Sequence, residues 1–304
     1  MTARWSHLPA LLDRWLPALV VLTAAAGLAA PAPGRFLDTH AAIPVVLAVL
    51  VLTAGTSVEA AAFRRLRDGL PAVALIVAVS TLALPALAWL AGRLVTDPAL
   101  RDGVLAAGVA PAEVATLALA ALASTDTALT ALLLITSTVA TVALAGPALS
   151  LLAGANTSVG VVALTGTLAL VVALPLTLGI AARARWPHAT PLRTAASTIG
   201  NLTLLALVYL VAAQIPHTIA YLPVIPALLA YLAAAAGLGW ALSRLVTARR
   251  RRAVLLPVAM RDFAVAAGIA DTAFGHTAAA PLGAYGILVL LFGSLVSHQR
   301  TTQR

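Results

Sequence analysis

Short polar connections divide the chain into ten stretches of about 20 mostly apolar residues, and this pattern fixes its class. A helix needs about 20 apolar residues to cross the hydrocarbon core of a bilayer. Hydrophobic residues make up 62% of the chain and charged residues only 10%, whereas soluble domains are nearer about one half and about one quarter. The sequence therefore predicts an all-α polytopic membrane protein with the lipid bilayer around it.

The predicted spans are residues 15–31, 42–62, 70–94, 102–122, 126–150, 158–182, 194–214, 222–246, 253–271 and 277–297. The first stretch could instead be a signal peptide, because Arg4 and Arg14 precede a short apolar run. However, the segment from Pro31 to Gly34 is a poor cleavage site. We therefore expect this stretch to stay in the chain as a membrane helix.

The placement of arginine gives a second indication of the span count. All 19 basic residues are arginine, and cytoplasmic loops collect arginine whereas translocated loops do not. With the N-terminus inside, only Arg35, Arg93 and Arg101 fall in outer loops, and Arg261 falls within a span. We therefore predict ten spans in the cell inner membrane with both termini cytoplasmic. The net charge of +9 then reflects membrane orientation, so we expect no nucleic-acid partner.

Five spans in each half is an odd number, so the second half enters the membrane from the side opposite to the first. Residues 1–153 and 154–304 are thus predicted to form two inverted five-helix repeats. The boundary lies in a loop without charged residues.

Two segments at matching places in these halves combine a proline with charged residues. They read APAEVA from Ala110 to Ala115 and LPVAMRDFAV from Leu256 to Val265. Pro111 and Pro257 should each kink or interrupt a helix, because proline lacks a backbone donor and clashes with the preceding turn. Broken backbone at membrane depth persists only where it faces protein or a water-filled cavity. We predict that the broken fourth and ninth helices meet there.

Glu113, Arg261 and Asp262 are the charged residues of these segments. A charge at the centre of a membrane helix costs on the order of 3 kcal/mol, so each group needs a partner or a function. Arg261 and Asp262 are adjacent and point in different directions on a helix, so they form no ideal pair with one another. Either Arg261 meets Glu113, or Asp262 carries protons in a partly wet cavity. The alternative is an ion pair that only fastens the crossing.

Three further candidates lie close to the first break. Thr116 and Thr130 could offer hydroxyls to a cation or a ligand, although threonines in membrane helices usually bond their own backbone. Asp126 precedes the fifth span, where a helix N-cap is the favoured interpretation. The chain has no cysteine, and its histidines show no spacing that would build a metal site. We therefore expect no metal and no other cofactor.

The segments GVAPAEVATLALAALASTDTALTALLLITSTVAT and MRDFAVAAGIADTAFG resemble the bile acid:sodium symporter superfamily. The resemblance covers essentially the whole chain in span count and repeat order. It implies a panel domain beside a core domain in which broken helices 4 and 9 cross, with an organic anion held between the domains and coupled to sodium. The family motif is matched by Pro111, Asp126, Ala128 and Leu129, with Thr116 in place of its serine.

The sequence departs from that family at the cation sites. Leu117 stands where the family has asparagine, and Pro257 and Arg261 stand where it has glutamate and glutamine. Asp262 replaces an asparagine. These changes remove oxygen ligands and install a fixed positive charge, so the usual sodium sites are expected to be absent. Arg261 would then substitute for the bound cation, with Asp262 or Glu113 titrating for proton coupling or balancing its charge; alternatively, Arg261 would pair with an anionic substrate.

The sequence as a whole favours a secondary active transporter of a small organic anion that works by alternating access. An enzyme is not expected, because no HExxH, aspartate-rich diphosphate motif or serine elbow occurs. An arsenite-type exporter of the same fold is the alternative within transport, weakened by the missing cysteine. A non-transporting membrane sensor is the alternative outside transport. The expected partners are a small anionic molecule and the bilayer.

Overall fold

The computed structural model describes residues 8–38, 42–56, 70–153, 165–166, 168–186, 190–214 and 219–298. These residues are helical apart from short connections and caps. Within them, extended backbone pairs only as an isolated antiparallel bridge between Ala112 and Arg261. The predicted all-α class is therefore confirmed for the described part of the chain.

Five described helices are long and apolar enough to cross a membrane. A sixth would be the segment Ala18–Ala29 with Pro31–Leu37, which bends by 90° at its break. The chain is thus a multi-pass helical membrane protein, whereas the ten-span inverted repeat stays a prediction. The five helices correspond to the third, fifth, seventh, eighth and tenth predicted spans: Leu70–Gly92, Thr127–Leu152, Thr194–Gln214, Leu222–Leu245 and His276–Ser297.

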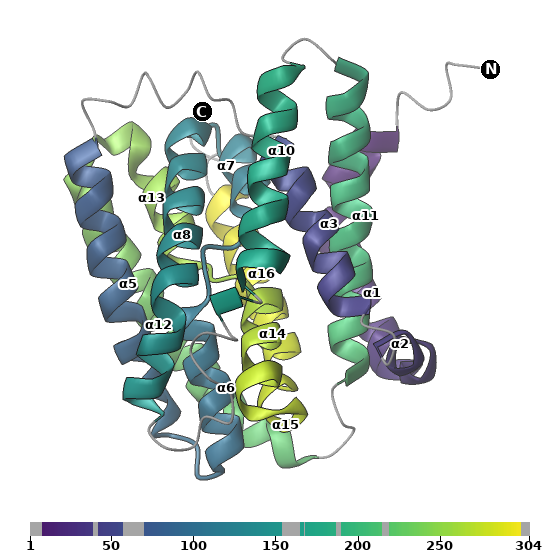
Figure 1. Cartoon of the computed structure of the whole chain (residues 1–304), viewed down its shortest axis with the longest axis vertical. Helices are drawn as coiled ribbons and strands as arrows, with labels where there is room; N and C mark the ends of the chain where they lie inside the picture. The colour runs from purple at the N-terminus through teal and green to yellow at the C-terminus, as the bar shows by residue number, and fades with distance from the viewer. Residues whose placement is uncertain are drawn as a thin grey trace.

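The helices gather in two groups that each combine segments from both halves of the chain (Figure 1). In the first, which we call the panel group, α11 packs on α1, α2 and α3, and α3 packs on α10. A small residue allows α10 to pack closely on α3, because a Cβ added at Gly179 would lie 2.2 Å from the Leu52 carbonyl oxygen. The panel group comprises α1 (Leu8–Ala29), α2 (Pro31–Asp38), α3 (Ala42–Thr56), η3 (Ala169–Ala173), α10 (Leu174–Arg185) and α11 (Thr190–Gln214).

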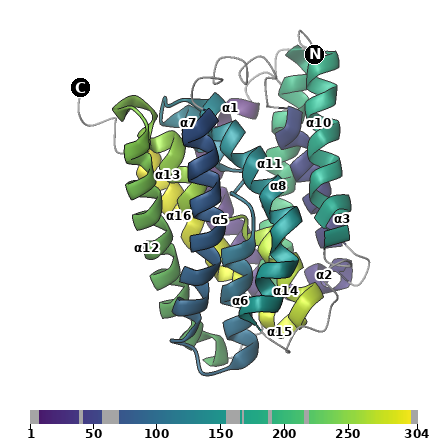
Figure 2. The same cartoon turned by 60° about the vertical axis from the view of Figure 1, so that its left-hand side comes forward.

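The second group, which we call the crossing group, holds both broken helices (Figure 2). In it α5 packs on α6 and α12, α12 packs on α13, and α6 packs on α14. Its members are α5 (Leu70–Gly92), α6 (Pro98–Val109), α7 (Thr116–Leu122), α8 (Thr127–Leu152), α12 (Ile225–Leu242), α13 (Arg251–Ala259), α14 (Phe263–Phe274), α15 (His276–Ala279) and α16 (Leu282–His298).

The first broken helix consists of α6 and α7, and its break begins where the sequence predicts it. Helix α6 ends at Val109, and the backbone of Ala110 is already extended, with φ −61° and ψ 156°. Pro111 follows directly and has no N–H with which to continue the helix. Helix α7 then begins at Thr116.

The second break lies one turn later than predicted. Pro257 stays inside α13, which continues to Ala259, and the backbone leaves the helix at Met260. Proline removes the hydrogen bond to the carbonyl four residues earlier, here that of Ala253. The Thr130 hydroxyl donates to this carbonyl at 3.4 Å, so the helix tolerates the proline. The break itself is set by Asp262, which caps the start of α14.

Candidate functional site

The two broken helices cross at a short antiparallel pairing of extended backbone. The N–H of Glu113 donates to the carbonyl of Met260 at 2.9 Å, and the N–H of Asp262 donates to the carbonyl of Pro111 at 2.8 Å. Between these bonds, Ala112 lies opposite Arg261. The structure therefore brings Glu113, Arg261 and Asp262 together, as the sequence predicts.

The predicted ion pair between Arg261 and Glu113 is absent. No ion pair within 4 Å joins them in the described chain. The reason is the alternation of side chains along extended backbone. Arg261 shares one face of the pairing with Ala112, so Glu113 and Asp262 share the opposite face.

Both carboxylates lie at helix N-termini, where the backbone carries partial positive charge. Asp262 Oδ1 accepts from the N–H groups of Ala264 at 3.0 Å and Val265 at 2.9 Å, which caps α14. Glu113 Oε2 accepts from the Phe263 N–H at 3.4 Å, and Oε1 accepts from the Ala115 N–H at 3.3 Å. Glu113 thus joins the start of α14 to the segment that leads into α7.

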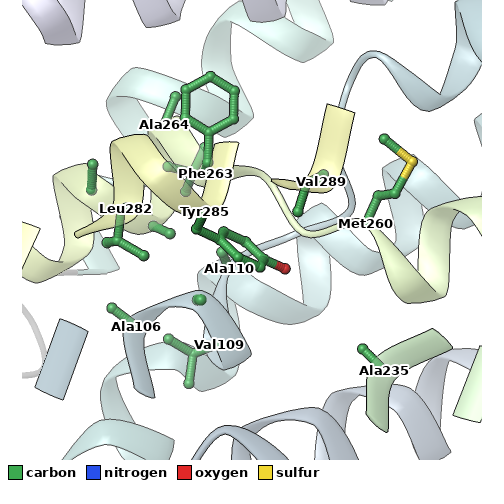
Figure 3. Close-up of a cluster of buried hydrophobic side chains, with 14 of the residues drawn as sticks. Ala106, Val109, Ala110, Ala235, Met260, Phe263, Ala264, Leu282, Tyr285 and Val289 are labelled. Atoms are coloured by element: carbon green, nitrogen blue, oxygen red, sulfur yellow. The ribbon is translucent and has the colours of Figure 1, made fainter. Parts of the chain in front are cut away.

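Arg261, in contrast to the two carboxylates, lies at the C-terminal end of a helix. Its guanidinium donates to the carbonyl of Ala110, the C-cap of α6, where helix dipoles favour a cation. Tyr231 and Tyr285, whose ring centroids are 5.8 Å apart, lie near this guanidinium. Figure 3 shows Tyr285 beside Ala110 and between the ends of the broken helices. Arg261 Nε is buried and has no hydrogen-bond partner among the described residues. The Tyr285 hydroxyl lies near the Tyr231 hydroxyl and the Arg261 backbone but makes no well-aligned hydrogen bond among those residues.

Side-chain hydroxyls satisfy the backbone groups that the first break leaves open. Tyr231 donates to the Ala107 carbonyl at 3.4 Å, the group that Pro111 cannot reach. Thr141 on α8 donates to the Val109 carbonyl at 3.1 Å, and Ser137 accepts from the Ala112 N–H at 3.1 Å. Sequence reasoning missed these three residues. For Ser137 and Thr141 the sequence does offer an indication, because their spacing places two hydroxyls on one face of an apolar helix.

The remaining predicted site residues bond to nearby backbone, and two of them also reach α13 or the segment before it. Thr116 donates to the Glu113 carbonyl at 2.6 Å, and Thr130 donates to the Asp126 carbonyl at 3.2 Å as well as to Ala253. Asp126 caps α8 by accepting from the Leu129 N–H at 3.0 Å. It also forms an ion pair with Arg250 at 2.9 Å.

A cavity of about 150 Å³ lies between the two helix groups. We call it the interface cavity. Residues of α3, η3 and α11 line one side, and residues of α14 and α15 line the other. None of the six predicted binding residues lines it. Its polar lining residues are Gln214, Asp271, Thr272 and His276.

Two of these polar residues are in direct contact, which the sequence alone does not predict. His276 Nδ1 lies 2.7 Å from Asp271 Oδ1. The sequence indicates only that His276 starts an outer helix, and the turn at Gly275, with φ 90°, brings it back beside Asp271. Helix α14 connects this pair to the crossing, because Val265 both lines the cavity and bonds to Asp262.

A repeated octapeptide also escaped the sequence reasoning. WLAGRLVT at Trp89 to Thr96 is followed in the second half by WALSRLVT at Trp240 to Thr247. In both copies the arginine stacks on the tryptophan, at 4.3 Å for Arg93 and 3.9 Å for Arg244. A chain built from two repeats, as predicted, is expected to carry such similar segments in both halves.

The sequence pattern of the Sodium Bile acid symporter family matches residues 44–222, more than half of the chain. The chain belongs to this family. The protein is therefore a membrane transporter of the organic-anion type that the family represents. A search of curated proteins found no match. The matched family region contains the first break but ends before α13 and α14, so their part in the site rests on the geometry described above.

Proposed function

We propose that this family member transports a small organic anion by alternating access and does so without a bound sodium ion. The observation that carries the proposal is the guanidinium of Arg261, which is buried at the crossing on the carbonyl of Ala110. A permanent positive charge occupies the end of a broken helix, where a coupling cation would otherwise be attracted.

The oxygen atoms around the crossing support this assignment. Sodium is a hard cation that would need several oxygen ligands, as other hard cations do. The Thr116 hydroxyl already bonds to the Glu113 carbonyl, and Asp262 Oδ1 already accepts two backbone N–H groups. The Ala110 carbonyl is occupied by Arg261. A sodium ion at the Ala110 carbonyl would have to compete with the Arg261 guanidinium for the same oxygen.

The interface cavity is the proposed substrate site. Its volume of about 150 Å³ corresponds to room for roughly ten water-sized probes, which suits a small carboxylate or sulfonate. Most of its lining is apolar, with Gln214 as a hydrogen-bond donor, whereas the Thr272 hydroxyl donates to the Gly268 carbonyl at 2.7 Å. The Nε2 of Gln214 is buried without a hydrogen-bond partner among the described residues. An anionic oxygen would supply that partner.

The charge balance of the cavity favours proton coupling. Asp271 contributes a negative charge, and no arginine lines the cavity in the described chain. His276 lines the cavity in contact with Asp271, and we assign it the role of proton carrier. An anion would thus enter together with a proton that His276 carries. Movement of the panel group against α14 would then open the cavity to the other side.

Ligand binding and flux test this proposal in two steps. Purified protein would be screened by thermal unfolding against small carboxylates and sulfonates, since a ligand of the native state raises the apparent Tm. Stabilising compounds would then be tested for uptake into proteoliposomes. We expect saturable uptake above that of empty liposomes. Binding without flux would contradict transport and favour a membrane sensor, and the absence of any stabilising anion would contradict the assigned substrate class.

A further inference from the structure

A second cavity of about 170 Å³ lies where α5 ends, α6 begins and α8 ends. We call it the arginine pocket. Its lining includes Trp89, Arg93, Arg101, Asp102 and Leu152. None of these residues belongs to the crossing or to the interface cavity, so the pocket is a separate feature of the molecule.

The arginine pocket carries an excess of positive charge. Two guanidinium groups and one carboxylate line it, and no ion pair within 4 Å joins Asp102 to either arginine in the described chain. Arg93 lies over the Trp89 ring at 4.3 Å. The Nη2 of Arg101 donates to the Val95 carbonyl at 3.2 Å. These contacts hold both guanidinium groups in place while leaving them donors for a ligand.

One donor in the pocket is left open. Arg101 Nε is buried and has no hydrogen-bond partner among the described residues. A buried N–H without an acceptor costs free energy, and the cost is greater for a charged group. A small shift of the Arg101 side chain toward the pocket would let a ligand oxygen reach this atom and remove that cost. Guanidinium groups present parallel N–H donors that suit carboxylate and phosphate oxygens.

The surroundings of the pocket suit the boundary between lipid and water. Leu90, Leu94 and Leu151 are 61%, 62% and 82% exposed, as expected of side chains that face lipid tails. Tryptophan is enriched at the membrane–water interface, and Trp89 is half-buried beside them. Arg93 and Arg101 are also two of the three arginines on the predicted outer side. The tendency of arginine to collect in cytoplasmic loops does not explain their presence there.

The Trp–Arg stack alone does not make a site. The similar octapeptide in the second half forms an equivalent stack between Trp240 and Arg244. This indicates that the stack is a feature of this type of helix end. The first copy differs because a cavity with the open Arg101 donor adjoins it.

We infer that the arginine pocket binds a phosphate oxyanion. The group could be the phosphodiester of an acidic phospholipid or free inorganic phosphate. Both would place oxygen atoms between Arg93 and Arg101. Asp102 on the pocket wall would disfavour a ligand of high negative charge, because like charges repel.

Thermal unfolding of the full-length protein in a neutral detergent tests this inference. Dioleoylphosphatidylglycerol or inorganic phosphate would be titrated at constant ionic strength, with phosphatidylcholine and chloride as blanks. The variants are Arg93→Gln and Arg101→Gln. The matched control is Arg185→Gln, which removes an exposed arginine at the end of α10. Arg101→Lys keeps the charge but removes Nε, and it serves if Arg101→Gln does not fold.

We expect saturable stabilisation of the wild type and of Arg185→Gln. Loss of a charged hydrogen bond should weaken the apparent affinity of the pocket variants by roughly tenfold or more. A response to phosphatidylglycerol alone assigns the pocket to a lipid headgroup, and a response to phosphate, with or without the lipid, assigns it to the free anion. Equal responses in the wild type and both pocket variants, or no response in the wild type, would overturn the inference.

Discussion

Ala112 and Arg261 lie opposite each other in the antiparallel bridge at which the two broken helices cross. Because this pairing is made by backbone atoms, it fixes which face each neighbouring side chain occupies. Arg261 reaches the C-terminal end of α6, while Glu113 and Asp262 reach the N-terminal end of α14. Each charge thus meets the end of a helix dipole that stabilises it. The crossing is held by this arrangement rather than by an ion pair between Arg261 and Glu113.

Replacing Ser137 by alanine should destabilise the crossing. The Ser137 hydroxyl accepts from the Ala112 N–H at 3.1 Å, and a buried N–H left without an acceptor costs about 1–3 kcal/mol. The measurement is the apparent Tm of the purified variant. Ser150→Ala is the matched control, because Ser150 lies exposed on the same helix and bonds only the Pro147 carbonyl. Equal Tm values for both variants would contradict the assigned role of Ser137.

Gly286 allows α16 to approach the crossing, so Gly286→Ala should be destabilising. A Cβ at this position would lie 2.7 Å from the Phe263 ring, and overpacking of a core typically costs about 1–3 kcal/mol. Gly237→Ala is the control, because nothing lies within 4 Å of a Cβ there. Alanine is the better helix former by about 1 kcal/mol, so the control should unfold at an equal or higher temperature. A Gly286→Ala variant as stable as wild type would refute the close packing.

Tyr231 and Tyr285 should respond differently to loss of the hydroxyl. Tyr231→Phe leaves the Ala107 carbonyl without its donor and should cost about 1 kcal/mol. Tyr285→Phe removes a buried hydroxyl that makes no well-aligned hydrogen bond among the described residues, although it lies near the Tyr231 hydroxyl and the Arg261 backbone, so it should cost less than Tyr231→Phe. Thermal unfolding of the two variants side by side measures the difference. The reverse order of stability would contradict the hydrogen-bond assignment.

His276→Gln should flatten the pH dependence of uptake. In the proposed mechanism uptake is coupled to protons and His276, in contact with Asp271, is the proposed carrier, so the wild type should transport faster as the external pH falls from 8 to 6. Glutamine keeps a hydrogen-bond donor but cannot take up a proton. The readout is the ratio of initial uptake rates at pH 6 and pH 8, with His298→Gln as a control at the end of α16. An unchanged ratio in His276→Gln would exclude this residue as the proton carrier.

Much of the fold could be predicted because apolar length and arginine placement are local properties of the chain. The break at Pro111 also followed from the sequence, since proline ends the hydrogen bonding of α6 at once. The break near Pro257 was predicted one turn too early because its consequence depends on Thr130, a distant residue that supplies the missing donor. A single helix does not reveal such compensation.

The candidate site was only partly predictable for a related reason. The meeting of Glu113, Arg261 and Asp262 followed from the equivalence of the two breaks, but the partner of Arg261 did not, because helical geometry was assumed where the backbone is extended. The family resemblance implies a substrate site between the two domains, but the sequence does not indicate which residues line the interface cavity. Its polar residues come from Gln214 at the end of α11 and from Asp271 and His276 around a turn, so only the packing of the two groups brings them together.

The sodium dependence of uptake shows whether Arg261 stands in for a coupling cation. A substrate identified by thermal unfolding would be supplied to proteoliposomes in sodium or choline buffer, for the wild type and for Arg261→Ala at matched protein amounts. If Arg261 occupies the place of the coupling cation, wild-type rates will be the same in both buffers and Arg261→Ala will lose uptake. A wild-type rate that collapses without sodium, or full uptake by Arg261→Ala, would contradict the account.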